Sequence, residues 1–174
     1  RYTLFKYISY LEELYRAVVL DNYVNRVKQK FWIEELQDKL FEFDYNLNDA
    51  LEHIDFRALL IQCQRLPKPK RDLCGFSGRK YLKDNSIALK ELRNAVMHNK
   101  FLLLYRGYEV CYVNGVDDSK SASLKANILN LIQFLPPEVG EQCVKDINAC
   151  KEDRNEADDT KWDLPPQIVI TIEL

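Results

Sequence analysis

Apolar residues recur every three or four positions along most of this chain, and this spacing limits the fold more than any other feature. Over residues 4–20 the recurring positions are Leu4, Ile8, Leu11, Leu14 and Val18. Side chains at this spacing line one face of an α-helix, and that face is stable only when it is buried against another element. The segment therefore predicts an amphipathic helix, and it favours a helical bundle as the fold.

Two further periodic segments follow, one starting near Tyr23 and one ending near Ile61. They predict either two helices broken near residues 43–48 or one long bent helix. The two prolines within residues 66–78 lack an N–H donor, and each disfavours helical geometry in the residue before it. We therefore expect residues 66–78 to form a basic loop.

The next helix is expected to begin near Ile87, because residues 84–86 offer polar side chains that can cap its first turn. Its end has two alternatives. The helix continues to the stop at Gly107, or it ends near Asn99 and the residues on both sides of Arg106-Gly107 pair as a hairpin.

The longer of these two helices would have two distinct faces. Leu89, Leu92, Val96 and Leu103 form the expected core stripe. A nearly opposite face carries Asn94, His98, Phe101 and Tyr105. Aromatic surface of this kind is rarely left in water, so the pattern predicts that a second chain or an RNA base covers it.

Residues 119–135 predict a further helix, residues 139–150 a short helix and residues 167–174 a strand. The expected fold class is mainly all-α: an up-and-down bundle of four to five helices with minor β pieces, namely the hairpin and the C-terminal strand. Residues 1–136 are expected to form the bundle. Residues 137–174 add an acidic C-terminal helix, a connection and the short strand to the same domain.

The composition narrows the class of protein. The chain has 174 residues, of which 47% are hydrophobic and 30% are charged, as is typical of one globular domain. No apolar run reaches the roughly 18 residues that a membrane span needs, and residues 1–20 lack the features of a secretory signal, so we expect a cytoplasmic protein. Five cysteines without a CxxC pair encode neither a zinc site nor a disulfide framework, and no metal or cofactor is expected.

The charge is unevenly distributed, although the net charge is only −2. Residues 138–163 contain nine acidic and four basic residues, whereas basic residues are concentrated over residues 65–83. A basic segment of this kind binds polyanions, although a solvated loop of ordinary charge has the same composition. If the chain binds RNA, we expect contacts from Lys68, Lys70, Arg71, Arg79, Lys80, Lys100 and Tyr105.

The stretch Arg93-Asn94-Ala95-Val96-Met97-His98 carries the groups best suited to chemistry. The chain has only two histidines, and histidine is the side chain that transfers protons most readily near neutral pH. Asn94 lies one helical turn before His98 and can orient its ring. Arg93 adds a permanent cation that stabilises negative charge on phosphate oxygens. His53 lacks such neighbours, and we interpret it as a structural residue.

These groups fit the cleavage of RNA without a metal ion, with the 2′-hydroxyl of RNA as the nucleophile. One group must accept the proton of that hydroxyl, and another must protonate the leaving oxygen. Each chain has one well-placed histidine, so a homodimer that pairs two motif helices across a two-fold axis would supply both. The pair Glu12-Glu13 is interpreted as solvated surface, with the alternative that an acid of the first helix reaches the motif.

The segment Leu89–Asn99 resembles the motif helix of the HEPN superfamily (higher eukaryotes and prokaryotes nucleotide-binding), whose signature is R-x4-6-H late in a helical bundle. A polar residue, often asparagine, follows the arginine in many members, as Asn94 does here. The resemblance implies a metal-independent endoribonuclease with a cleft built by a dimer, in toxin-antitoxin, abortive-infection or CRISPR-linked antiviral defence. It also implies that Arg93 contacts the scissile phosphate, His98 transfers protons and Asn94 assists.

A non-catalytic HEPN-like domain is the alternative, because some members of the superfamily have lost activity and act as scaffolds or ligand sensors. Such a domain would bind a protein partner, a nucleotide or RNA. A third alternative is an antitoxin-like or regulatory subunit. For the enzyme, the expected partners are RNA, a second copy of the chain and an antitoxin or other partner protein, with no membrane.

Overall fold

Eight helices and one pair of short strands make up the part of the chain that the computed structural model describes, namely residues 1–24, 32–74, 79–100, 102, 105, 107–111 and 120–152. The helices are α1 (Tyr2–Val24), α2 (Glu34–Glu42), α3 (Leu47–His53), α4 (Phe56–Arg65), α5 (Lys68–Leu73), α6 (Arg79–Met97), α7 (Leu124–Phe134) and α8 (Pro137–Glu152). The strands are β1 (Val110–Cys111) and β2 (Lys120–Ser121). The fold is thus mainly α-helical with a minor β piece, as the apolar spacing predicts.

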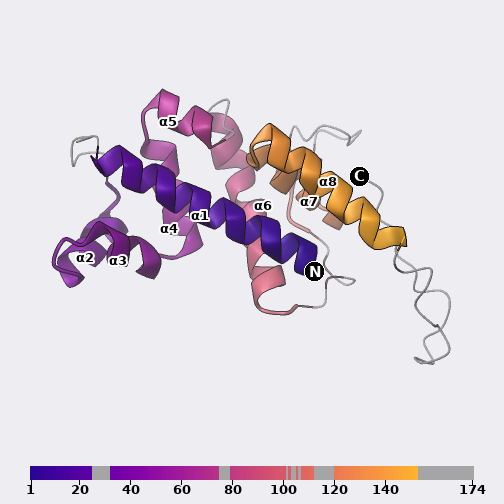
Figure 1. Ribbon diagram of the computed structural model, residues 1–174, viewed down its shortest axis with the longest axis horizontal. Helices are drawn as coiled ribbons and strands as arrows, with labels where there is room; N and C mark the ends of the chain where they lie inside the picture. The colour runs from indigo at the N-terminus through magenta and orange to yellow at the C-terminus, as the bar shows by residue number, and fades with distance from the viewer. Residues whose placement is uncertain are drawn as a thin grey trace.

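Helix α1 runs from the end of the molecule that holds α2 and α3 to its middle, where it passes α6 and α8 (Figure 1). It contacts α3, α4, α5, α6 and α8. Its predicted apolar face is confirmed, because Ile8 and Leu11 are fully buried and Leu4 and Val18 nearly so. Burying a side chain of this size contributes about 1.5–3 kcal/mol. This face of α1 is therefore a main contributor to the core.

Two breaks divide the segment after α1 into α2, α3 and α4. The predicted break near residues 43–48 is confirmed: Asp44 and Tyr45 have φ of 49° and 62°, and these left-handed values end α2. A second break, which the sequence did not predict, precedes α4. It arises because the Asp55 carboxylate accepts a 2.7 Å hydrogen bond from the N–H of Ala58 and so caps a new helix. Tyr23, the predicted start of a second helix, belongs to α1.

Helix α5 replaces part of the basic loop predicted for residues 66–78. That prediction is wrong for residues 68–73, because Pro69 lies in the first turn of α5. The N–H groups of a first turn have no intrahelical acceptor, so proline is tolerated there. The cations of this segment consequently lie on a helix that packs against α1.

Helix α6 begins at Arg79 rather than near Ile87, so residues 84–86 lie inside the helix and do not cap it. Asn85 is fully buried. Its Nδ2 donates to the Cys111 carbonyl at 2.7 Å, and its Oδ1 accepts from the Cys111 N–H at 2.8 Å. The asparagine therefore attaches β1 to α6. The helix ends at Met97, which confirms the shorter of the two predicted alternatives.

The hairpin predicted around Arg106-Gly107 is wrong in its pairing. Strand β1 pairs antiparallel with β2, with Val110 opposite Ser121 and Cys111 opposite Lys120. The described residues before Gly107 form no strand. The C-terminal strand predicted for residues 167–174 lies outside the described residues.

Helix α7 begins at Leu124 rather than near residue 119, because Ser123 accepts a 3.1 Å hydrogen bond from the N–H of Ala126 and caps the helix. Helix α8 packs against α1 and α7. Lys6 Nζ and the Tyr7 hydroxyl donate to Asp146 at 2.8 and 2.7 Å, and these bonds hold the pKa of Asp146 at about 2.

Among the described residues, no helix combines the length and the apolarity that a bilayer span requires.

A buried asparagine fixes the chain between α6 and α7. Asn127 Nδ2 donates to the Tyr108 carbonyl at 2.9 Å, and its Oδ1 accepts from the Tyr108 N–H at 3.3 Å. Gly107 lies against the same side chain and has a φ of +77°, which glycine adopts far more readily than other residues. The close approach at Gly107 and the hydrogen bonds of Asn127 therefore depend on each other.

We expect Gly107→Ala to lower the free energy of unfolding by about 1–3 kcal/mol, the usual cost of holding another residue in glycine's backbone conformation. A methyl group there would lie 2.6 Å from both the Ala122 carbonyl oxygen and Asn127 Nδ2. Urea denaturation followed by circular dichroism measures the change.

Gly140→Ala is the matched control. Its methyl group would lie 3.3 Å from the Ile132 carbonyl oxygen, and alanine has the higher helix propensity in α8, so the unfolding free energy should change by less than about 1 kcal/mol. Equal losses in the two variants would contradict a specific role for the backbone at Gly107.

Candidate functional site

Helix α6 carries the Arg93–His98 motif and lies between several other elements. It contacts α1, α4, α7 and β1 (Figure 1). Leu89, Leu92 and Val96 of the predicted core stripe are buried, and Leu103 lies outside the described residues. Because close packing fixes this face, it also fixes the rotation of the helix and the directions of its other side chains.

Arg93 points from α6 toward α1 and α4. Its Nη2 lies 3.3 and 3.4 Å from the two carboxylate oxygens of Glu12, and its Nε lies 3.4 Å from Oε2. The guanidinium carbon is 5.8 Å from the centre of the Phe56 ring, within range of a cation–π contact. About a quarter of the side chain, 25%, stays exposed. The Arg93 guanidinium is thus held against Glu12 and Phe56, while part of the side chain remains exposed.

Glu12 is the residue that holds Arg93, and only 7% of it is exposed. The prediction of a solvated Glu12-Glu13 pair is wrong for Glu12, whereas Glu13 is exposed. The alternative, that an acid of the first helix reaches the motif, is confirmed. The spacing contained the signal, because Glu12 follows the fully buried Ile8 by four residues and precedes the fully buried Tyr15 by three.

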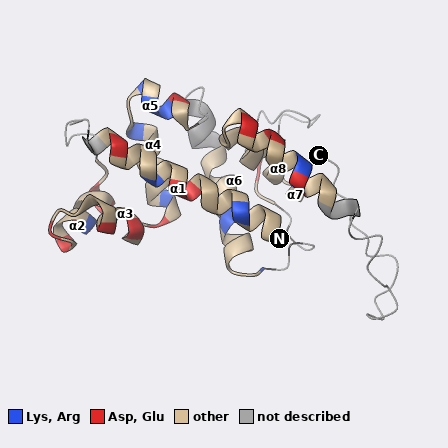
Figure 2. Ribbon diagram, in the orientation of Figure 1, with Lys and Arg blue, Asp and Glu red and all other residues tan. Residues whose placement is uncertain are grey.

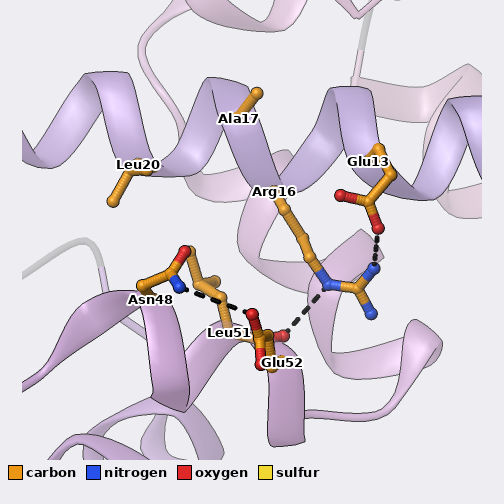
Figure 3. Close-up of a pocket in the computed structure, with 7 residues that line it drawn as sticks. All are labelled: Glu13, Arg16, Ala17, Leu20, Asn48, Leu51 and Glu52. Carbon is orange, nitrogen blue, oxygen red and sulfur yellow. Dashed lines mark hydrogen bonds and ion pairs between the residues drawn. The ribbon is translucent and has the colours of Figure 1, made fainter.

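A second guanidinium shares the Glu12 carboxylate. Arg16 Nη2 donates to Glu12 Oε1 at 2.8 Å. The remaining groups of Arg16 donate to Glu13 at 2.8 Å and to the Leu51 carbonyl at 3.2 Å, so Arg16 extends from α1 to α3 (Figure 3). A buried carboxylate is stable only with such partners. Glu12 therefore joins α1 to the motif through Arg93. Arg16, which shares the same carboxylate, adds the contact with α3.

His98 directly follows Met97, the last residue of α6. Asn99 follows with a φ of 53°, the N–H of Lys100 donates to the Ala95 carbonyl at 2.9 Å, and the N–H of Asn99 donates to the Val96 carbonyl at 3.4 Å. These bonds form a Schellman motif, which stops the helix and leaves His98 as its C-cap. The His98 side chain is exposed. It lies about 7.5 Å beyond Arg93 along the helix axis, five residues at 1.5 Å each.

Asn94 lies beside Arg93 rather than bonded to the His98 ring. Its Oδ1 is 3.5 Å from Arg93 Nη1, and its backbone carbonyl accepts the N–H of His98 at 3.0 Å. Among the described residues, none forms a hydrogen bond with the His98 imidazole. The orientation of the ring by Asn94 therefore stays a prediction.

The face predicted to continue past His98 is wrong for Tyr105, because α6 ends first. Tyr105 is partly buried and packs against the core. Its hydroxyl lies 3.4 Å from Asn127 Oδ1, and burial, with a smaller effect of the Glu91 charge, raises the pKa of Tyr105 to about 12. Phe101 lies outside the described residues. Lys100 is exposed directly beside His98.

The other cations predicted to contact RNA lie at the opposite end of α6. Lys68, Lys70 and Arg71 belong to α5, which precedes α6, and Figure 2 shows their charges there. Lys70 Nζ forms an ion pair with Asp21 of α1. Arg79 and Lys80 form the first turn of α6. The 19 residues of α6 extend over about 28 Å at 1.5 Å per residue, so this group does not meet His98 directly.

His53 has the surroundings of a structural residue. Its Nδ1 lies 2.8 Å from the Asp49 carbonyl oxygen, and its ring centre lies 4.4 Å from that of Phe43. Within the described ranges, no group of three or more histidine, cysteine or acidic side chains is arranged to hold a metal ion. Cys63, Cys74 and Cys143 are free and buried.

Comparison of the chain with protein-family models, with curated proteins and with solved structures gives no match.

We expect Glu12→Gln to lower the free energy of unfolding by about 2 kcal/mol, because it removes the charge that compensates two guanidinium groups. This loss is smaller than that for a fully buried ion pair, because both guanidinium groups reach solvent. Glu13→Gln is the control, because Glu13 is exposed and a surface pair contributes little, about 0.5 kcal/mol or less. Urea denaturation of both variants measures the difference. Similar stability losses would show that Glu12 is not the buried centre of this cluster.

Proposed function

We propose that this protein is a metal-independent endoribonuclease that cleaves RNA at a site composed of Arg93 and His98 from two copies of the chain. The observation that carries the proposal is the end of α6, where an anchored guanidinium and an exposed imidazole belong to residues about 7.5 Å apart along the helix axis and about 140° apart around it. The anchored cation provides a preorganised site for charge on a phosphate. The imidazole provides proton transfer near neutral pH.

In the proposed reaction, the His98 imidazole of one copy removes the proton from a 2′-hydroxyl. The oxygen attacks the adjacent phosphorus, and the bond from phosphorus to the 5′-oxygen breaks. The imidazolium of the second copy's motif gives its proton to the leaving 5′-oxygen, which becomes a hydroxyl. The products are a 2′,3′-cyclic phosphate and a 5′-hydroxyl, and Arg93 stabilises the negative charge on the phosphate oxygens during attack.

The homodimer belongs to the same proposal, because one exposed histidine per motif cannot be base and acid in a single step. An isologous contact through the C-terminal end of α6 would place two copies of His98 in one groove. Lys100, exposed next to His98, would add positive charge to that groove.

The biological setting is proposed from the HEPN resemblance of Leu89–Asn99. It is a toxin or antiviral defence nuclease acting in the cytoplasm, with an antitoxin or another partner protein that restrains it. A nuclease of this type is harmful to its own cell, so an inhibitor is the natural partner.

One observation favours a second function, that of a non-catalytic helical domain that binds protein, nucleotide or RNA. Arg93 already has an acidic partner in Glu12 and an aromatic partner in Phe56. A guanidinium with these contacts also fits a purely structural role. The two functions differ in whether the purified protein cleaves RNA.

We expect the purified protein to cleave single-stranded RNA in the presence of EDTA and to leave DNA of the same sequence intact, because DNA lacks the 2′-hydroxyl. His98→Ala should lower the cleavage rate by about 10²–10⁴-fold, the usual contribution of a general acid or base. Arg93→Ala should lower it by about 10²–10³-fold. Gel analysis of end-labelled RNA measures the rate, and mass spectrometry identifies the 2′,3′-cyclic phosphate.

His53→Ala is the matched control, since it removes the other histidine and should leave the rate unchanged. Arg93→Lys keeps a positive charge beside Glu12 and tests whether loss of activity arises from loss of fold. Cleavage that survives in His98→Ala, or that needs a divalent metal, contradicts the proposal. Absence of any cleavage by the wild-type protein supports the non-catalytic domain.

A further inference from the structure

A cavity of about 410 Å³ lies between α4 and α6. Its lining includes Arg57, Ile61 and Gln64 of α4 and Ser86, Ile87 and Lys90 of α6. Two of the described residues that line it are cationic, and none of them is acidic. Its volume falls within the range of about 300–1,000 Å³ that ligand sites usually have.

A second cavity, between α1 and α3, shows that size alone does not define a ligand site. Its volume is about 360 Å³, and its lining includes Arg16, Glu13 and Glu52 (Figure 3). Arg16 already donates to Glu12, Glu13 and the Leu51 carbonyl. The cation of that cavity is therefore neutralised, whereas Arg57 of the cavity between α4 and α6 has no acidic partner among the described residues.

The two cations of the α4–α6 cavity have donors left for a ligand. Arg57 is exposed, and no described residue forms an ion pair with it. Lys90 forms an ion pair with Glu91 at 2.8 Å, but an ammonium group has three donors. An anion between α4 and α6 would therefore meet a guanidinium from one helix and an ammonium from the other.

The cavity lies along α6 between the first turn of the helix and the Arg93–His98 motif. Lys90 lies three residues before Arg93 on α6 and about 12 Å before His98 along the axis, eight residues at 1.5 Å each. Arg57 directly follows Phe56, the ring that Arg93 covers. On the other side, α6 leads back to its first turn at Arg79, and α5 with its cations precedes that turn in the chain. A strand lying along α6 would pass over this cavity.

We propose that the cavity between α4 and α6 is a subsite for single-stranded RNA next to the cleavage site. Arg57 and Lys90 bind backbone phosphates, and the aliphatic surface of Ile61 and Ile87 accepts one base. The amide of Gln64 is placed to hydrogen-bond to the edge of that base. This inference rests on the proposed function, since the ligand is the RNA whose cleavage is proposed.

The test measures binding without cleavage. The probe is a fluorescein-labelled RNA oligonucleotide with 2′-O-methyl groups at every position, which has no 2′-hydroxyl to attack phosphorus. Fluorescence anisotropy gives the affinity over a range of salt concentrations. Arg57→Gln/Lys90→Gln should weaken binding at least about 10-fold and make the slope of log K against log salt shallower by about 1.4, because each phosphate contact to a single strand contributes about 0.7.

The control is Lys125→Gln/Lys145→Gln, which removes two exposed cations from α7 and α8 and changes the net charge equally. Its affinity and salt slope should match those of the wild type. Arg57→Gln alone should change the slope by about 0.7, and because Arg57 is exposed this variant keeps the test informative if the double variant does not fold.

Equal weakening of RNA binding in the control and in Arg57→Gln/Lys90→Gln would overturn the proposal, because it would show an effect of net charge only. Binding of 5′-AMP that depends on Arg57 and Lys90, together with unchanged RNA affinity, would also overturn it and assign the cavity to a free nucleotide. If RNA binding depends on Arg57 and Lys90 but the protein does not cleave RNA, the result would support the subsite and refute the nuclease.

Discussion

The buried carboxylate of Glu12 is the interaction on which the arrangement of this protein depends. It binds Arg93 of α6 and Arg16 of α1, and Arg16 also donates a hydrogen bond to the Leu51 carbonyl of α3. A carboxylate with so little exposure requires both a cation and hydrogen bonds, so α6 cannot shift against α1 without leaving the Arg93 guanidinium unpaired. The same contact gives the Arg93 guanidinium a single direction. The packing of α6 against α1 and the orientation of Arg93 therefore depend on the same carboxylate.

Helix α6 arranges the remaining parts of the proposed site in linear order. Its first turn follows the cations of α5, its middle borders the cavity shared with α4, and its last turn carries Arg93 and Asn94 before His98 ends the helix. The Schellman motif at Asn99 matters for this order, because a longer helix would surround His98 with further side chains. Exposure of His98 is thus a consequence of where the helix stops.

The features that depend on local spacing could be predicted from the sequence, and those that depend on distant partners could not. The apolar period correctly places α1 and the core stripe Leu89, Leu92 and Val96. Asn85 is a residue type that often caps helices, and the sequence predicted it in that role. Its partner in the structure, Cys111, lies 26 residues further along the chain. Pro69 ends a helix in most contexts and starts one here. In the candidate site, the residue types of Arg93 and His98 and the spacing that buries Glu12 were evident. The contact of Glu12 with Arg93 and the cation pair Arg57 and Lys90 required the packing of α1 and α4 against α6.

Nuclear magnetic resonance of the two imidazoles tests the central claim most directly, that the end of α6 contacts RNA. The chain has two histidines, so each gives an assignable side-chain signal, and His53 serves as an internal reference. On addition of the uncleavable 2′-O-methyl RNA, the account predicts that the His98 signals shift and the His53 signals stay in place. Unchanged His98 signals at an RNA concentration that saturates binding would contradict it.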